Sequence, residues 1–199
     1  MRNFDELNII SYKDYFDVMS LSDKQKRERI RAAEELEDII LYYLISIDLS
    51  RTIPIDPKDR FIEDYSEVVR KYIDDDDFIS MYVPMLAVLL AESTLKHINE
   101  EYYLSVDRAM SIAANEANTI LNQSDYDKAT IAGYTRKQWI TEHDNKVRPT
   151  HIEVEDLIIP INELFVVGSA VMRYPHDFVM AADHSEEISN CRCSIAYLR

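Results

Sequence analysis

The feature of the sequence that most limits its fold is the uneven distribution of residues that bend a chain or carry reactive groups. Both glycines, Gly133 and Gly168, lie after residue 132, together with the only Trp, both Cys and four of the five His. Two Gly and six Pro among 199 residues are too few for a loop-rich all-β fold, so long helices are favoured. We therefore expect the first half to be a helical scaffold and the last third to contain a site or a specialised fold.

Composition indicates a globular protein. Hydrophobic residues make up 47% and charged residues 30% of the chain, enough to bury one good core or two small ones. The N-terminal residues 1–6 include no apolar h-region, so we predict no signal peptide. No apolar run approaches the roughly 20 residues that span a bilayer. We expect no membrane partner, and folding in a cytoplasm.

The formal net charge of -15 argues against generic nucleic-acid binding, because such a surface repels phosphate backbones. One candidate basic patch remains in the C-terminal third, and we expect its members to pair with nearby acids. They are Arg136, Lys137, Lys146, Arg148, Arg173 and Arg192.

Apolar residues at helical spacing predict four long helices between residues 22 and 132. Ser22 and Gln25 form a capping box for a helix over 23–49, whose basic first half, 24–31, should face solvent or a partner. Residues 4–19 are expected to form a short helix or a docking arm.

The other three predicted helices are marked by their ends. Pro54 and Pro57 should form a turn, after which Asp59 caps a helix through residue 72. Asp77 should cap a helix over 78–100, which Pro84 starts or kinks. The fourth helix is expected over 105–132, with Gly133 as its left-handed C-terminal residue. On that helix Glu116 and Asn122 are either exposed at the edge or buried against the module that follows.

After Gly133 the pattern changes to the alternation of strands, predicted over 137–141, 157–159, 164–167 and 192–198. Residues 168–177 are predicted as a loop and 181–187 as a short helix. The expected fold is therefore α+β, with a mostly α-helical N-terminal region followed by a small C-terminal α+β module of short antiparallel strands. We place the helical scaffold or docking region at 1–104 and the second unit at 105–199, with a leading helix over 105–132 and a motif region over 134–199.

Cys191 and Cys193 are the basis of a predicted metal site. Two residues apart on a strand, their thiols would point to one face, and they are poorly placed to form a disulfide. With His151 they supply three ligands for zinc, and the fourth would be His143, Asp144, His176 or His184. The alternative is that both Cys pack as small apolar core residues.

Asp144 and Arg148 have the spacing of a pair on one helical turn. In an alternative arrangement, Arg148, Arg192 and His151 surround an anion while Asp144 acts as a general base. His151 itself is open to three roles, as metal ligand, base or core residue. Trp139 is predicted to lie in the core.

Taken together, these residues resemble a family. The ordered set consists of Trp139, Thr141, Asp144, Val147, Arg148, His151, Phe165, Pro175, Asp177 and the terminal Asn190-Cys191-Arg192-Cys193. It looks like the phage Mu F-like minor head protein family, also called phage head morphogenesis proteins, and the resemblance covers about residues 105–199. Two departures concern turns. The family commonly has a Gly where Glu155-Asp156 stand, and a small residue or Gly and a second Pro where His176 and Phe178 stand.

The resemblance implies a non-enzymatic minor head protein. Its expected partners are the phage portal protein and capsid or scaffold proteins, with packaged DNA nearby only by proximity. Its expected location is the virion, in the head interior or at the portal vertex, after assembly in the bacterial host cytoplasm. The alternative is a metal-assisted hydrolase, or a nuclease-like or effector enzyme domain that a phage delivers.

Overall fold

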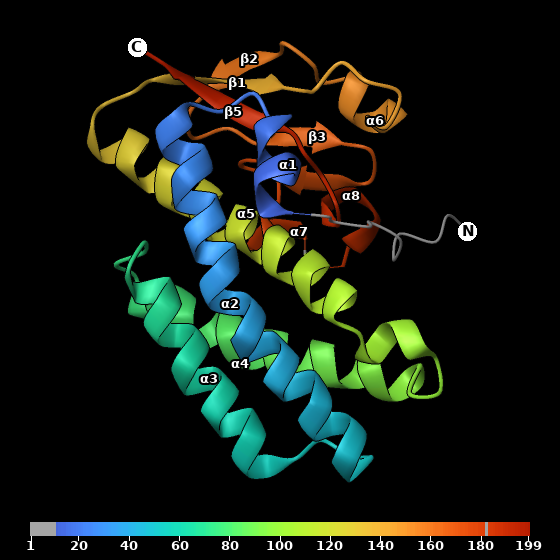
Figure 1. Cartoon of the computed structure of the whole chain (residues 1–199). Coiled ribbons are helices and arrows are strands. Elements are labelled where there is room, and N and C mark those ends of the chain that lie inside the picture. Colours follow the sequence, from blue (N-terminus) through green and yellow to red (C-terminus); the bar gives the residue numbers. More distant parts are fainter. Residues whose placement is uncertain (1–10, 182) are drawn as a thin grey trace.

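The computed structural model describes residues 11–181 and 183–199. Five helices form the first part of the chain, with a single 3-10 turn, Glu101–Leu104, before the last of them. These five helices are called the helical body. In Figure 1 most of it lies below the strands, and its last helix, α5, crosses directly beneath them. The helices are α1 (Tyr12–Asp17), α2 (Asp23–Ser50), α3 (Ile55–Arg70), α4 (Asp76–Lys96) and α5 (Val106–Ile131).

The sequence prediction of the helical body is confirmed in kind, but the starts of two helices are wrong. The cap of α4 is Asp75 rather than Asp77, and its carboxylate accepts a hydrogen bond from the Phe78 N–H at 2.9 Å. The Ser22–Gln25 capping box begins α2, and Ser105 caps α5 as its N-terminal residue. However, α3 starts after Pro54, so Pro57 lies in its first turn and Asp59 is inside the helix. Proline is tolerated in a first turn, where its missing N–H has no intrahelical partner to lose. Residues 4–10 of the predicted short helix or docking arm lie outside the described residues.

The predicted exposure of residues 24–31 at the start of α2 fails at one position, Arg29, while Lys24, Arg27 and Arg31 are exposed. The Arg29 side chain is fully buried and donates hydrogen bonds to Asn118 Oδ1 at 3.2 Å, Asn122 Oδ1 at 2.7 Å and Asp125 Oδ2 at 3.2 Å. All three acceptors lie on α5, so this basic side chain joins two long helices. The sequence pattern of residues 24–31 does not reveal this contact, because burying Arg29 is favourable only when the acceptors on α5 lie next to it.

Glu116 of α5 is buried, but it faces the helical body rather than the module that follows. Its Oε2 accepts hydrogen bonds from the Tyr65 hydroxyl at 2.6 Å and from the Tyr82 hydroxyl. Burial raises the pKa of Glu116, and the two tyrosine hydrogen bonds oppose this rise. Asn122 does contact the module, because its amide donates to the Pro175 carbonyl at 2.8 Å.

The C-terminal part confirms the α+β fold class and its antiparallel strands. The central strand β1 (Arg136–Ile140) pairs with β2 (Ile158–Pro160) on one side and β5 (Ser194–Leu198) on the other. A second sheet contains β3 (Phe165–Val167) and β4 (Ala170–Met172). Three single-turn helices complete the module: α6 (Pro149–Ile152), α7 (Phe178–Ala181) and α8 (Ser185–Ile188).

The predicted loop over 168–177 is partly wrong, since β4 lies within it. Gly168 and Ser169 form a two-residue turn between β3 and β4, with Gly168 at φ +59°. The turn residues Gly168 and Ser169 before this strand and Pro175 after it make the whole stretch look like a loop in the sequence. The prediction also placed Cys191 and Cys193 on the last strand, whereas both precede β5.

The buried apolar side chains of the described residues form two clusters. The larger includes side chains from α1 to α5, among them Leu36, Tyr65 and Ala117. The smaller surrounds Trp139 and Phe165 in the module. The apolar side chains of α5 belong to the helical cluster, while several of its polar side chains bond to the module. The division at residue 104 stays a prediction.

Within the described part of the chain, one helix, α4, is long and apolar enough to cross a membrane by length and composition alone. Its most apolar 18-residue window has a mean hydropathy of 1.6. Half of that window is buried inside the fold.

Candidate functional site

The alternation along β1 directs Lys137 and Trp139 into the module and leaves their neighbours nearer the surface. Trp139 is fully buried, as predicted, with its ring edge-to-face against Phe165 at 5.1 Å and His151 at 5.7 Å between centroids. His151 comes from α6, which Pro149 begins. The Trp139 indole therefore packs beside the His151 imidazole in the interior of the module.

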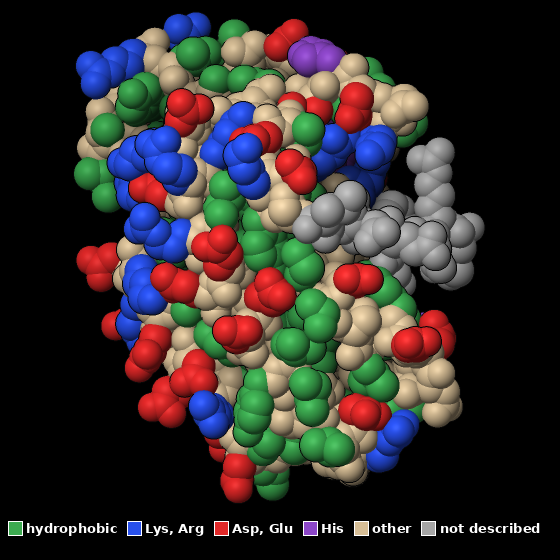
Figure 2. Space-filling view, in the orientation of Figure 1, with side chains coloured by type: hydrophobic (Ala, Val, Ile, Leu, Met, Phe, Trp, Pro, Cys, Tyr) green, Lys and Arg blue, Asp and Glu red, His purple; other side chains and the backbone are tan. Residues whose placement is uncertain are grey.

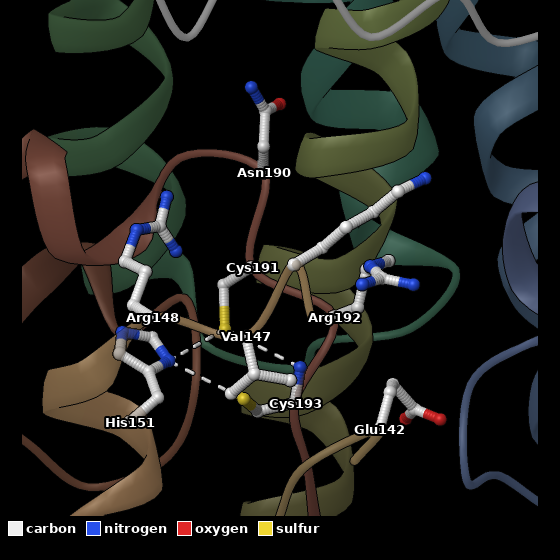
Figure 3. Close-up of a pocket in the computed structure, with 9 residues that line it drawn as sticks. Glu142, Val147, Arg148, His151, Asn190, Cys191, Arg192 and Cys193 are labelled. Carbon is white, nitrogen blue, oxygen red and sulfur yellow. Dashed lines mark hydrogen bonds between the residues drawn. The ribbon is translucent and has the colours of Figure 1, made fainter. Parts of the chain in front are cut away.

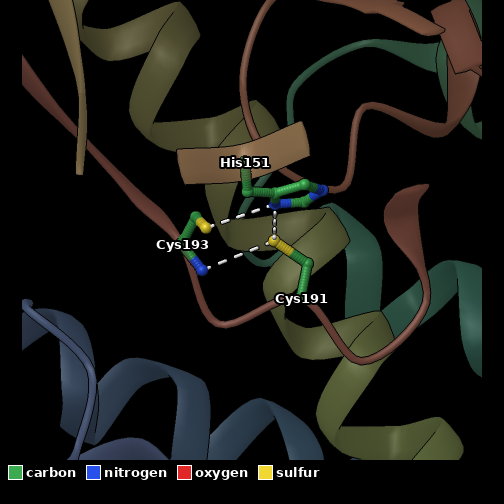
Figure 4. A group of neighbouring side chains, drawn as sticks. All are labelled: His151, Cys191 and Cys193. Atoms are coloured by element: carbon green, nitrogen blue, oxygen red, sulfur yellow. Dashed lines mark hydrogen bonds between the residues drawn. The ribbon is translucent and has the colours of Figure 1, made fainter. Parts of the chain in front are cut away.

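His151, Cys191 and Cys193 converge in the interior, as Figure 4 shows. The His151 Nδ1 atom lies 3.4 Å from Cys193 Sγ and 3.5 Å from Cys191 Sγ. The Cys193 backbone N–H donates to Cys191 Sγ at 3.4 Å. The three ligand atoms lie within 4.8 Å of one another, and all three residues are buried. Three soft or borderline donors thus surround one point, the arrangement that zinc favours.

The opposite nitrogen of the imidazole contacts a carboxylate. His151 Nε2 lies 3.2 Å from Glu187 Oε2, which also accepts a hydrogen bond from the Thr150 hydroxyl at 2.8 Å. Gly168 makes room for this carboxylate, because a Cβ atom at that position would lie 2.1 Å from Glu187 Oε1. The contact fixes the orientation of the ring and leaves Nδ1 facing the two sulfurs.

The electrostatics of the cluster favour one thiolate. Burial would raise the pKa of the Cys191 thiol, but the hydrogen bond from Cys193 and the charge of His151 outweigh it and hold that pKa well below its usual value. For His151, burial lowers the pKa and the Cys191 thiolate raises it, with a net rise. The hydrogen bond with Cys191, together with burial, raises the pKa of Cys193. The cluster therefore resembles a thiolate–imidazolium pair beside a neutral thiol.

A small cavity borders the cluster, and Figure 3 shows the side chains around it. Its volume is about 20 Å³, which is room for about one water molecule. It is lined by Glu142, Lys146, Val147, Arg148, His151, Asn190, Cys191, Arg192 and Cys193. All three sulfur and nitrogen donors therefore adjoin a space for one small ligand.

The residues predicted as a fourth ligand each have another contact. His143 Nδ1 lies 2.5 Å from Glu155 Oε1, and His184 Nδ1 lies 3.0 Å from the Ser169 hydroxyl. His176 Nε2 lies 2.5 Å from the Cys191 carbonyl oxygen, beside the cluster but directed at the backbone. Asp144 is the fourth candidate, and it bonds to Arg192.

The predicted pair between Asp144 and Arg148 is wrong. Arg192 Nη2 donates to both carboxylate oxygens of Asp144 at 2.7 Å, and it holds the pKa of Asp144 below its usual value against the opposing effect of burial. Arg148 donates to the Ser189 carbonyl. Residues 144–148 do not form a helix, so the four-residue spacing does not bring these side chains together. With Asp144 engaged by Arg192, the alternative of a general base beside a bound anion gains no support.

The remaining motif residues hold loops in place. The buried Thr141 hydroxyl donates to Glu155 Oε1 at 2.6 Å. Asn190, in the left-handed region at φ +57°, forms a reciprocal amide pair with Asn115 of α5: its backbone N–H donates to Asn115 Oδ1 and its Oδ1 accepts from Asn115 Nδ2, both at 2.7 Å. This pair attaches the Asn190–Cys193 segment directly to the helical body.

The expected pairing of the candidate basic patch with nearby acids is confirmed for two of its six residues. Arg173 bonds to Asp177 through both Nε and Nη2 at 2.8 Å, and Arg192 bonds to Asp144, as expected for pairing with nearby acids. For Lys137 the expected pairing is wrong, because the side chain is fully buried and its Nζ has no hydrogen-bond partner among the described residues. Burial lowers the pKa of Lys137 to about 8, and its Nζ lies 5.3 Å from the ring centroids of Tyr126 and Phe165.

Three residues that hold the cluster or its surroundings in place were not among the predicted site residues. Glu187 was assigned only to a short helix, and no spacing rule connects an acid to a His 36 residues before it. Ser20 binds the module from the other end of the chain: its N–H donates to Glu142 Oε1 at 2.8 Å, and its carbonyl accepts from the Ser194 hydroxyl at 3.1 Å. Asn115 could have been found, because it lies in the helix that the family resemblance includes.

The fold and site define a class of protein: a helical body fastened by polar contacts to a small α+β module with a buried Cys–Cys–His cluster. The family model described as Phage Mu protein F like protein matches residues 89–196, from within α4 to β5. The chain therefore belongs to the phage Mu F-like family, as predicted from its motif.

The chain is also similar to part of a longer protein. The chain is 32% identical over 101 residues to the NAD(+)--arginine ADP-ribosyltransferase EFV of Enterococcus faecalis (strain ATCC 700802 / V583). The alignment covers 49% of this chain and 20% of that protein, so the chain matches about a fifth of the relative's length. No solved structure matches the chain.

Proposed function

We propose that this protein is a minor head protein that acts in phage head morphogenesis at or near the portal and accompanies DNA packaging or ejection. The observation that carries the proposal is the family match over residues 89–196, which includes α5 and nearly all of the module. On this proposal the module keeps its shape through the motif residues, and the helical body binds the portal, capsid or scaffold proteins.

The surface of the helical body supports a docking role. Several apolar side chains are exposed on α2 and α3, including Leu49 at 80% and Ile55 at 71%. On the face drawn in Figure 2, hydrophobic side chains gather over the lower part of the molecule, while most Lys and Arg lie over the upper part. The net charge of -15 would limit adhesion to packaged DNA and leave protein contacts as the main interactions.

The proposal is tested by deleting the gene from the phage or prophage that encodes it and complementing with variants. Ile45→Asp/Leu49→Asp places charges on the exposed apolar face of α2, whereas Val166→Asp does so at the one exposed position of strand β3 in the module. We expect the α2 variant to be absent from purified heads and the β3 variant to be incorporated. Heads of the deletion phage that form, fill and infect normally would refute the assembly role.

A second candidate, an enzyme or effector function, is favoured by the name of the relative from Enterococcus faecalis. The cavity at the cluster argues against catalysis there, because 20 Å³ holds about one water whereas ligand pockets occupy about 300–1,000 Å³. A larger depression of about 660 Å³ is lined by the four acids Asp74–Asp77, which would repel a pyrophosphate. We propose that the segment shared with the relative is an assembly module to which that longer protein adds its activity.

An assay separates the two candidates. The purified chain is incubated with labelled NAD and an arginine-containing acceptor protein, and label transfer and nicotinamide release are measured. The assembly proposal predicts no activity above that of heat-denatured chain. Turnover that is lost in a folded point variant would establish the enzyme.

A further inference from the structure

We propose that His151 Nδ1 and the thiolates of Cys191 and Cys193 bind one zinc ion, with a water molecule as the fourth ligand, and that the ion stabilises the fold of the module. This inference does not depend on the head-assembly function, because it rests on the donor atoms and their surroundings alone.

The spacing of the donors fits a tetrahedral ion. Zinc–sulfur bonds of about 2.3 Å and zinc–nitrogen bonds of about 2.0–2.1 Å place nitrogen and sulfur about 3.5–3.6 Å apart at the tetrahedral angle. The observed separations of Nδ1 from the two sulfurs are 3.4 and 3.5 Å. One imidazole nitrogen can donate only one hydrogen, so hydrogen bonding alone does not require two sulfurs at equal distance. A shared ion does.

The outer contacts are those that a zinc-bound histidine needs. A ligating imidazole donates its other N–H to a carboxylate or carbonyl, which fixes the tautomer and strengthens the ligand. Glu187 occupies that position at 3.2 Å from Nε2, and it is itself held by Thr150. The Cys193 N–H, which points at Cys191 Sγ, supplies the hydrogen bond that stabilises a metal-bound thiolate.

The fourth position faces a space of suitable size. The cavity of about 20 Å³ adjoins all three donors, and it admits about one water molecule. An open coordination position is usual in catalytic zinc sites, but this cavity has no room for a substrate beside the ion. The site is therefore structural, with solvent completing the coordination.

The surroundings select a soft, divalent ion. Thiolate and imidazole donors favour zinc over magnesium or calcium, which prefer oxygen. Burying two thiolates without a counter-charge is costly, and a divalent cation neutralises both. The ion would add cross-links between α6 and the segment before β5, in a module whose apolar core is small.

The test begins with the metal content of the full chain, purified with reductant. We expect about one zinc per chain in the wild type and in His143→Gln, which changes a histidine with a side chain 66% exposed. Cys191→Ser/Cys193→Ser and His151→Gln should contain almost none. In Glu187→Gln the ion should remain but bind about 10–100-fold more weakly, because the outer carboxylate is lost.

A second measurement covers the case in which the ligand variants fail to fold. Zinc is removed from the wild type with a chelator, and cobalt is added while the absorption spectrum is recorded. We expect saturation at about one equivalent, with a thiolate-to-cobalt charge-transfer band and the intense visible bands of tetrahedral cobalt. Substoichiometric zinc together with no charge-transfer band would overturn the proposal, as would full zinc retention in the folded double-cysteine variant.

Discussion

The helical body and the C-terminal module reach stability in different ways. Among the described residues, thirty buried apolar side chains form the core of the body, and nine form that of the module. The body buries long apolar helix faces against one another and adds a few buried polar contacts, such as that between Tyr65 and Glu116. The module has short strands and single-turn helices, and it depends on buried polar pairs, among them His151–Glu187 and Thr141–Glu155. Family-specific residues are concentrated where the apolar core is small.

The largest effect should come from opening a cavity in each core. Leu44→Ala in α2 and Met172→Ala in β4 both remove fully buried side chains, and each should cost about 2–5 kcal/mol. Trp139 is the only Trp and lies in the module, so its fluorescence reports on the module while far-UV circular dichroism reports mainly on the helices. We expect Met172→Ala to shift the fluorescence transition in denaturant more than the dichroism transition. Equal shifts would show that the two regions unfold as one unit.

The contact between the helical body and the module is tested at Asn115, which bonds to Asn190. Asn115→Ala leaves the Asn190 N–H and amide without their α5 partner, which should cost the module about 1–3 kcal/mol. The fluorescence midpoint should fall while the helical signal is retained. Thr130→Ala, on the exposed part of the same helix, should stay within about 0.5 kcal/mol of the wild type. If both variants behave alike, the reciprocal pair does not fasten the module.

The buried Lys137 provides a test with a defined pH dependence. Burial lowers its pKa from 10.5 to about 8, so folding penalises the charged form. Below pH 8 the ammonium is charged in both states and the penalty is complete; between pH 8 and 10.5 it disappears, so the wild type gains stability as pH rises. Lys137→Met should therefore be more stable by about 1–3 kcal/mol at neutral pH.

The outcome that would contradict this prediction is a stability difference between Lys137→Met and the wild type that does not change between pH 8 and 10.5. Denaturation at a series of pH values gives both curves. Arg136→Met, which changes the exposed neighbour on β1, is the matched control and should show little pH dependence over the same range.

The smallest effect concerns the two turns at which the chain departs from its family. Asp156 has φ +57° and His176 has φ +62°, so the left-handed geometry is present although neither residue is Gly. An L-residue in this region carries about 1–2 kcal/mol of strain, so Asp156→Gly should stabilise the chain by about 0.5–1 kcal/mol after its entropy cost. Glu153→Gly, at φ -63°, should instead destabilise it by a similar amount. A thermal melt that ranks them in the opposite order would show that the Asp156 side chain matters more than the backbone.

The comparison also explains which parts could be predicted. Apolar periodicity and end signals located the long helices, since Ser22, Ser105 and Gly133 act within a few residues of their positions. Strand β4 was missed because it directly follows the Gly168-Ser169 turn in a stretch that looks like a loop. The start of α3 was placed too late because Pro54 and Pro57 were interpreted as one turn. The motif predicted the family, and the set of metal ligands stays a prediction that the geometry supports.

The sequence by itself determined the helical body, the antiparallel α+β module and the family, because these depend on local spacing or on an ordered motif. Only the tertiary structure decided which charges meet. Asp144 pairs with Arg192, Arg29 lies buried between α2 and α5, and Glu187 supports His151 from the far side of the Gly168 turn. The physical reason is that such contacts join residues tens of positions apart, and their energies depend on burial and direction, which no spacing along the chain encodes.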